Sequence, residues 1–228
     1  MRDATVAPVK RLGVALAVGV TMALVPACME GKRPVLVPAA DADQRSTGDA
    51  AIDVVLRRLE LAETATFEAR YQIHTLLGDT VTTAEAAQEG LKQRAVRVGD
   101  VLYRDGTERD PVTCSTATGA CEPGLDDAQI ASLMVTRTFF STSAVARLGQ
   151  VGRVASGPAT LEDRELGGAA VVCVTIPVSG GSTTFCATPE GVLATYEGAD
   201  TRITLLEYRT DLTDGLGQRL LSGAVAES

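Results

Sequence analysis

The sequence predicts an α+β fold in which helices pack on the concave face of a curved antiparallel β-sheet, a half-barrel meander. Much of the region 66–211 alternates between apolar and polar side chains, which is typical of strands with one buried face. Short turns such as Val98-Gly99-Asp100-Val101 separate the runs, and strands joined by so short a turn are antiparallel. Two stretches with a helical period interrupt the alternation, and they supply the helices that cover the sheet.

The first predicted element is an amphipathic helix within residues 47–63. Its apolar side chains recur at steps of three and four residues: Ile52, Val55, Leu59 and Ala62. Asp49 or Thr47 can cap this helix, because a side-chain oxygen at that position accepts hydrogen bonds from the free backbone N–H groups of the first turn.

The cleanest alternation in the chain lies in residues 64–76 and predicts a strand. Its apolar side chains share one face: Phe67, Ala69, Tyr71 and Ile73. Its polar side chains share the other face: Glu68, Arg70, Gln72 and His74. The apolar face is the one that we expect the helices to cover.

Further strands are expected within residues 81–98 and from residue 101 onward, with a turn at Asp105-Gly106. Residues 125–148 predict a second helical stretch. From about residue 151 six strand-like segments follow: VGRVASG, ATLEDREL, AAVVCVTIPV, TTFCATP, GVLATYEGAD and RITLLEYRTDL. The folded domain is therefore expected to span residues 49–211, and residues 212–228, which lose the alternation, are expected to form a flexible tail.

The N-terminus has the pattern of an export signal. Arg2, Lys10 and Arg11 precede the apolar run 12–27, which is shorter than the roughly 20 residues that cross a bilayer. The residues Val25-Pro26-Ala27-Cys28 resemble the lipobox of bacterial lipoproteins. That resemblance implies that residues 1–27 are a lipoprotein signal peptide and that Cys28 carries the lipid. An ordinary secretory signal with a chance cysteine, or an uncleaved anchor, is the alternative.

Residues 28–48 contain two prolines and mixed charge without a regular period, and they predict a flexible linker behind the lipid-modified Cys28. We therefore expect a domain on the outer face of the cell membrane, in the cell envelope. Its contact with the membrane is expected through the lipid anchor.

Four cysteines remain when Cys28 is set aside: Cys114, Cys121, Cys173 and Cys186. An even number in an exported chain predicts two disulfides. Three pairings are open, and the short spacings favour the sequential one, Cys114 with Cys121 and Cys173 with Cys186. The sequence has no CxxC motif and one histidine, His74, so neither a metal site nor another cofactor is expected.

Charge and motifs narrow the classes of function further. The net charge is -8, tryptophan is absent and the basic residues form no stripe, so a nucleic-acid partner is not expected. The motifs GxSxG, HExxH, the Walker loop and GxGxxG are also absent, and His74 and Asp126-Asp127 are interpreted as surface and helix-start residues. We therefore predict a protein that is not an enzyme.

The lipobox ending at Cys28, the leading amphipathic helix, the strand TFEARYQI, the segment RVGDVLYRDG and the late hairpin GVLATYEG together resemble the LolA/LppX-like group of bacterial envelope proteins. The resemblance spans about residues 47–210. It implies a half-barrel sheet with helices on its concave face, and several members bind lipids or acyl chains in the space between. Related periplasmic modules sense mislocalised lipoproteins. The two disulfides and the smaller number of strands depart from the better-known members.

Two functions follow as hypotheses. The first is a lipoprotein that binds a lipid, an acyl chain or a lipidated partner in a half-barrel cavity. The second is a protein-interaction or envelope-sensor module with a filled core and no ligand. Seven side chains either line that cavity or fill the core: Phe67, Tyr71, Ile73, Tyr103, Phe139, Phe140 and Tyr196.

Overall fold

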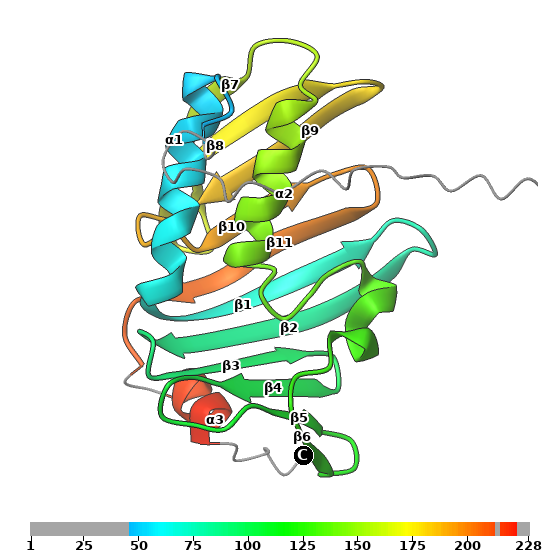
Figure 1. The fold of residues 1–228 in the computed structure, drawn as a ribbon, viewed down its shortest axis with the longest axis vertical. Coiled ribbons are helices and arrows are strands. Elements are labelled where there is room, and N and C mark those ends of the chain that lie inside the picture. The colour runs from blue at the N-terminus through cyan, green and yellow to red at the C-terminus, as the bar shows by residue number, and fades with distance from the viewer. Residues whose placement is uncertain (1–45, 213–214, 223–228) are drawn as a thin grey trace, which may run out of the picture. The chain divides into compact units, whose positions relative to one another are not determined.

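A computed structural model describes residues 46–212 and 215–222 of the chain, and their ribbon is shown in Figure 1. These residues form one antiparallel sheet of eleven strands together with α- and 3₁₀-helices. The predicted α+β class with an antiparallel meander is therefore confirmed. The signal peptide, most of the linker and Cys28 lie outside the described residues.

The sheet consists of two meanders that meet at its centre. The first meander contains β1 (Thr66–Thr75), β2 (Thr80–Glu89), β3 (Gln93–Val98), β4 (Val101–Asp105), β5 (Val112–Ser115) and β6 (Cys121–Pro123). The second contains β7 (Thr160–Leu166), β8 (Ala169–Val178), β9 (Gly181–Ala187), β10 (Leu193–Glu197) and β11 (Thr201–Arg209). β1 pairs with β11, so the first strand and the last strand are neighbours and β6 and β7 are the edges.

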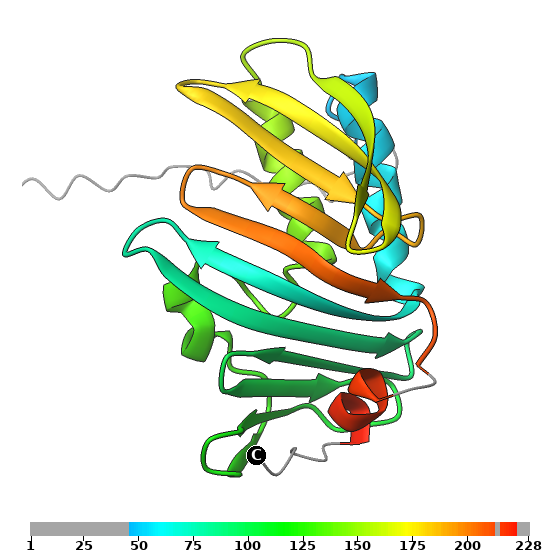
Figure 2. The same ribbon diagram turned by 180° about the vertical axis from the view of Figure 1, so that it is seen from behind.

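The helices are α1 (Ala50–Leu59), η2 (Glu60–Thr64), η3 (Asp127–Leu133), α2 (Thr142–Arg153) and α3 (Leu216–Ser222). α1 and α2 lie side by side over the second meander, on the face toward the viewer in Figure 1. α3 lies on the opposite face, which Figure 2 shows from behind, and packs on β2 and β3. The two faces of the sheet therefore carry separate apolar cores.

α1 forms where the helical period predicted it. Its buried side chains are Ile52, Val55, Leu56 and Leu59. Asp49 is the N-cap, and its Oδ1 accepts hydrogen bonds from Ala51 N at 2.8 Å and from Ile52 N at 3.4 Å. Of the two predicted caps, Asp49 is the one that binds the first turn, and Thr47 instead donates to Asp53.

The predicted second helix is divided in the structure. Residues 127–133 form η3, and α2 begins only at Thr142. Met134 ends η3 in a left-handed conformation with a φ of 58°, which redirects the chain between the two helices. The prediction of a strand in the segment VGRVASG is wrong, because α2 continues through Val151 to Arg153 and β7 begins only at Thr160. Gly149 and Gly152 weaken the helical pattern there, since glycine is a poor helix former.

The expected tail contains a helix. Leu220 and Leu221 of α3 are buried and form a second core with Ala87, Ala95 and Leu102 on the back of the sheet. Seven residues are too few to show a helical period in the sequence, and this helix depends on contacts with a distant part of the chain.

Two disulfides form with the sequential pairing that the spacing favours. Cys114 and Cys121 link β5 to β6, and Cys173 and Cys186 link β8 to β9. Each pair joins residues that are direct partners in the strand register. Among the described residues, the helices are too short or too polar to cross a membrane.

Candidate functional site

The seven side chains proposed as cavity residues separate into two groups. Phe67, Tyr71, Ile73, Tyr103 and Phe140 are at most 1% exposed and lie in the core between the sheet and the helices. Phe139 and Tyr196 line a small cavity beneath α2.

The aromatic side chains of the core pack against one another. The ring of Phe140 meets that of Phe67 edge to face at 5.4 Å, and the ring of Phe139 meets that of Tyr71 at 5.0 Å. Phe139 and Phe140 are themselves 5.5 Å apart. These distances are those of packed aromatic pairs, so the space between the sheet and the helices is largely filled.

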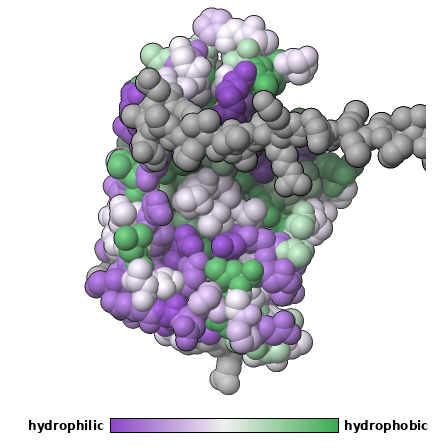
Figure 3. Space-filling view, in the orientation of Figure 1, coloured by the Kyte–Doolittle hydropathy of each residue, from purple (hydrophilic) through white to green (hydrophobic). Residues whose placement is uncertain are grey.

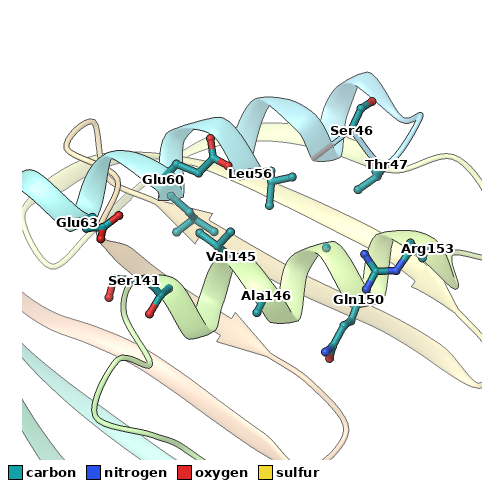
Figure 4. Close-up of a pocket in the computed structure, with 13 residues that line it drawn as sticks. Ser46, Thr47, Leu56, Glu60, Glu63, Ser141, Val145, Ala146, Gln150 and Arg153 are labelled. Carbon is teal, nitrogen blue, oxygen red and sulfur yellow. The ribbon is translucent and has the colours of Figure 1, made fainter. Parts of the chain in front are cut away.

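A groove of about 540 Å³ lies between α1 and α2 and is drawn in Figure 4. We call it the helix groove. It is lined by Ser46, Thr47, Leu56, Leu59, Glu60, Glu63, Ser141, Thr142, Val145, Ala146, Gly149, Gln150 and Arg153. Figure 4 shows Glu63 and Ser141 near one end and Ser46, Thr47 and Arg153 near the other. The groove thus combines apolar, hydroxyl and charged side chains along its length.

Hydrogen bonds fix the end of the helix groove at which α1 begins. Asp53 accepts bonds from Thr47 N and Thr47 Oγ1, each at 2.8 Å, and from Ser46 Oγ at 2.7 Å. Partial burial raises the pKa of Asp53, but the bonds from Thr47 and Ser46 outweigh it, and the net pKa lies below the ordinary value. This carboxylate therefore remains ionised and holds the chain where it enters α1.

The other end of the helix groove is held by Gln88 of β2. The buried Gln88 side chain donates from Nε2 to the carbonyl oxygens of Ala62, Glu63 and Ala65, at 2.8, 2.9 and 3.1 Å. These bonds tie η2 to the sheet and fix the backbone that carries Glu60 and Glu63. The groove is consequently anchored at both ends.

A second cavity, the chamber, lies between α2 and the sheet and has a volume of about 170 Å³. Its lining residues are Val135, Thr136, Phe139, Ser143, Ala144, Ala146, Arg147, Gln150, Phe185, Leu193, Tyr196 and Ile203. Ala146 and Gln150 also line the helix groove, so α2 separates the two cavities. The Arg147 guanidinium lies 4.6 Å from the centre of the Tyr196 ring, and its Nη2 donates to Met134 O at 3.0 Å.

The polar residues that the sequence analysis considered for catalysis or metal binding lie at a turn and at the start of a helix, where they stabilise the fold. His74 Nε2 lies 2.6 Å from Asp79 Oδ1 at the turn between β1 and β2, and the Asp79 side chain is 89% exposed. Asp126 caps η3 by accepting from Ala128 N, and Asp127 pairs with Arg137. Within the described part of the chain, no three histidine, cysteine or acidic side chains are grouped as metal ligands.

The visible surface carries no broad apolar area over its lower half. In Figure 3, hydrophobic residues there are scattered singly or in small groups among hydrophilic ones. Scattered apolar residues are normal on a protein surface and do not indicate an interface. The recessed lining of the helix groove is therefore a better candidate for binding than that part of the surface.

No protein-family model matches the chain, and no curated protein matches its sequence. Among solved structures it is similar to MucB in complex with MucA(peri), with a TM-score of 0.43 and 14% identity over 77% of this chain and 60% of that one. It is also similar to MucB alone, with a TM-score of 0.43 and 17% identity over 78% of this chain and 64% of that one.

A LolA superfamily protein from Nitrosomonas europaea has a TM-score of 0.34 and 10% identity, over 74% of this chain and 96% of that one. The chain spans less than two thirds of the length of the MucB chains that it matches. These similarities are distant, and the scores are too low to carry a site or a function from those proteins to this chain.

The helix groove was not predicted from the sequence. One signal for it is the presence of Ala146 and Gly149 on α2, because small side chains on a helix leave open space beside a neighbouring helix. That signal becomes informative only when α1 is known to lie next to α2, and the sequence did not predict that contact.

Proposed function

We propose that the chain is an exported, lipid-anchored binding protein without catalytic activity, and that its helix groove binds an extended segment of a partner protein. The observation that carries this proposal is the helix groove itself. Its volume of about 540 Å³ lies within the roughly 300–1,000 Å³ usual for ligand sites. The filled core beneath the helices favours the interaction module over a carrier with a large internal cavity.

The mixed lining of the helix groove suits a polypeptide. An extended segment presents backbone donors and acceptors as well as side chains, and Ser141, Thr142 and Gln150 offer polar atoms to them. Leu56 and Val145 offer apolar contacts along the same groove. The helix groove therefore offers both hydrogen bonds and apolar contacts to one bound segment.

The charges of the helix groove give a bound segment a direction. Glu63 belongs to η2, at one end of the groove, whereas Arg153 lies at the end of α2 beside Thr47. A segment with basic residues toward η2 and acidic residues toward Arg153 has the complementary arrangement. We expect partner segments to follow this order of charge.

A lipid or acyl-chain ligand is the second candidate. The side chains of Leu56, Leu59 and Val145 contribute apolar wall to the helix groove, and an acyl chain can lie along them. Polar side chains interrupt this wall, however, so it is less suited to an acyl chain than to a polypeptide.

Export and anchoring belong to the same proposal. The disulfides Cys114–Cys121 and Cys173–Cys186 support an oxidising compartment outside the cytosol. The lipobox-like residues before Cys28 support cleavage at that point and lipid attachment to Cys28. The domain then lies in the cell envelope, on the outer face of the membrane.

The helix groove is tested by selecting peptides from a random library on the purified full chain. We expect selected peptides to bind less tightly to a Thr142→Trp variant, by roughly tenfold or more, because the indole occupies the groove. Arg57→Trp is the matched control, since Arg57 is an exposed residue of α1 outside the groove lining. Failure to enrich peptides, or equal binding to the Thr142→Trp variant, contradicts the proposal.

The lipid candidate and the anchor have separate tests. Native mass spectrometry of the Cys28→Ser chain, exported from a bacterial host, detects any copurified lipid. A lipid displaced by Thr142→Trp would support the second candidate over the first. Labelling with palmitate is expected to depend on Cys28, and a Cys28→Ser variant that is still labelled contradicts lipidation at this residue.

A further inference from the structure

We propose that the chamber beneath α2 is a separate binding site for a small monocarboxylate that carries one apolar group of about six carbon atoms. The inference does not depend on the helix groove, because the chamber lies on the other flank of α2 and has its own polar residues. It rests on the size of the chamber, an arginine without an acidic partner and a cluster of hydroxyl groups.

The size and lining of the chamber define the apolar part of the ligand. Its volume of about 170 Å³ is close to the ~150 Å³ of an apolar cavity that binds benzene. The apolar lining residues Phe139, Phe185, Leu193 and Ile203 come from the sheet and from the loop before α2. The Tyr196 ring contacts both Phe185, at 5.0 Å between ring centres, and the Arg147 guanidinium. One aromatic ring or a six-carbon chain therefore fits, whereas a long acyl chain does not.

Arg147 supplies the charge that the ligand must match. The guanidinium has five N–H groups, and its hydrogen bond within the fold runs from Nη2 to Met134 O at 3.0 Å. Within the described residues, no carboxylate forms an ion pair with Arg147. A half-buried arginine that lacks an anion is a favourable site for one, since a carboxylate accepts two parallel bonds from the guanidinium.

Three hydroxyl groups form a cluster that joins the loop before α2 to the helix itself. Ser143 Oγ is 2.7 Å from Thr136 Oγ1 and 2.6 Å from Thr138 Oγ1, and the two threonine oxygens are 3.3 Å apart. Thr136 and Ser143 line the chamber together with Arg147. Because each hydroxyl can rotate its proton, the cluster can donate to a carboxylate without leaving its other members unpaired.

The loop that carries Thr136 and Thr138 begins at a strained residue, Met134. Met134 has a φ of 58°, and its carbonyl oxygen is the acceptor of the Arg147 bond. A non-glycine residue in this region costs energy, and such strain clusters at binding and catalytic sites. Arg147 and the strained loop thus fix each other at the polar side of the chamber.

The charge of the site selects a monocarboxylate among anions. Arg147 is the cation that lines the chamber, and the whole chain has a net charge of -8. A polyanion meets one positive charge and general repulsion, whereas a single carboxylate is matched by one guanidinium. An uncharged alcohol of the same shape leaves Arg147 without an anion.

The test uses the purified full chain and four probes: 3-phenylpropionate, hexanoate, the neutral 3-phenylpropan-1-ol and acetate. NMR titration of backbone amides is expected to show binding of the first two acids at roughly 1 mM or tighter, as befits ligands of this size. The largest shifts are expected between residues 134 and 147. The alcohol lacks the charge and acetate lacks the apolar group, so both are expected to bind at least tenfold more weakly.

Arg147→Gln is expected to weaken binding of 3-phenylpropionate by about tenfold or more, because it removes the charge-assisted bonds. Arg57→Gln is the matched control, since Arg57 is an exposed arginine that lines neither the chamber nor the helix groove. Arg147→Lys keeps the charge and is expected to retain more affinity than the glutamine variant.

Three results would overturn the proposal. One is the absence of acid-induced shifts up to about 10 mM, which is well above the dissociation constant expected for probes of this size. Another is equal binding of the alcohol and the acid to the unmodified chain, a comparison that does not depend on how any variant folds. The third is unchanged binding to an Arg147→Gln variant that melts like the unmodified protein.

Discussion

The side chain of Asp49 joins the start of α1 to Ala159, a residue that lies 110 positions later in the chain. Its Oδ1 caps α1, while its Oδ2 accepts a hydrogen bond from Ala159 N at 2.9 Å. Ala159 directly precedes β7, the edge strand of the second meander. One carboxylate therefore fixes both the first helix and the entry to an edge of the sheet.

Substitution of Asp49 separates these two roles. Asparagine keeps an oxygen for the cap, since it is as good an N-cap residue as aspartate, but its amide nitrogen cannot accept from Ala159 N. We expect the free energy of unfolding to be highest in the unmodified protein, lower in the Asp49→Asn variant and lowest in the Asp49→Ala variant. Urea denaturation measures it, and equal stability of all three proteins would contradict the shared role.

The same carboxylate makes the stability of the fold depend on pH. The bond from Ala159 N lowers the pKa of Asp49 most, and those from Ala51 and Ile52 lower it further. A carboxyl group whose pKa is lower in the folded state contributes stability above its unfolded pKa of about 3.9, and this is lost as the pH falls through the folded pKa.

Below about pH 4 we therefore expect the free energy of unfolding to fall less steeply in the Asp49→Ala variant than in the unmodified protein. Urea denaturation at a series of pH values measures this slope. Identical slopes for the two proteins would contradict a lowered pKa at Asp49.

The N-cap and the disulfides were predictable because their signals are local. Asp49 stands directly before an amphipathic run, and each cysteine pair encloses a single hairpin. The helix α3 and the helix groove were not predictable from local signals. α3 depends on Glu68 and Ala87, which lie far earlier in the sequence. The helix groove depends on the contact between α1 and α2, which only the assembled sheet determines.

The aromatic residues of β1 show that a correct alternation pattern did not decide between a ligand cavity and a filled core. The alternation in β1 placed Phe67 and Tyr71 on the covered face, and the structure confirms that face. Alternation does not show whether a covered side chain packs against another side chain or faces an open cavity. That outcome depends on Phe139 and Phe140, which reach the same face from a loop after η3.

The two disulfides are expected to differ in their resistance to reduction. Cys173 and Cys186 are 0% exposed, whereas Cys121 lies exposed on the edge strand β6. A reductant must reach a sulfur atom in order to cleave the bond, so mild reduction is expected to open Cys114–Cys121 first. Alkylation followed by peptide mapping identifies the freed cysteines. Earlier alkylation of Cys173 or Cys186 would contradict this order.

Removal of the two disulfides is expected to lower the free energy of unfolding by different amounts. The sequence separations are 7 and 13 residues. Loop-closure entropy predicts a loss of roughly 2.4 kcal/mol for the shorter loop and about 2.9 kcal/mol for the longer one. Paired cysteine-to-alanine variants and urea denaturation measure the two losses. A larger loss at the exposed pair would contradict the prediction.

Tyr71 carries a hydroxyl group that the fold does not use. The side chain is 0% exposed, and within the described residues its hydroxyl has no hydrogen-bond partner. Burial, with a smaller effect from Tyr208, raises the pKa of Tyr71 well above its ordinary value, so the group is neutral. Because an unpaired buried hydroxyl is costly, we expect Tyr71→Phe to leave the free energy of unfolding unchanged or to raise it by up to roughly 1 kcal/mol.

Tyr208 provides the matched control for this change. Its hydroxyl donates to Glu190 Oε2 at 2.7 Å, and its ring stacks on Phe67. We expect Tyr208→Phe to lower the free energy of unfolding by about 1 kcal/mol or more, since it removes a bond to a charged acceptor. Thermal and urea denaturation compare the two variants. A larger loss from Tyr71→Phe than from Tyr208→Phe would contradict the assignment.

Glu68 is expected to control the docking of α3. Its side chain is buried on the back of β1, and its Oε2 accepts a hydrogen bond from Gly217 N at 2.8 Å. Glu68→Ala removes this acceptor, and hydrogen exchange at Leu220 and Leu221 is expected to accelerate roughly tenfold or more, as a bond to a charged group contributes about 1.5–3 kcal/mol. Glu68→Gln keeps an acceptor and is expected to have a smaller effect. Because the opening is local, exchange in α1 is expected to remain unchanged, and equal acceleration in α1 and α3 would show that Glu68 supports the whole fold instead.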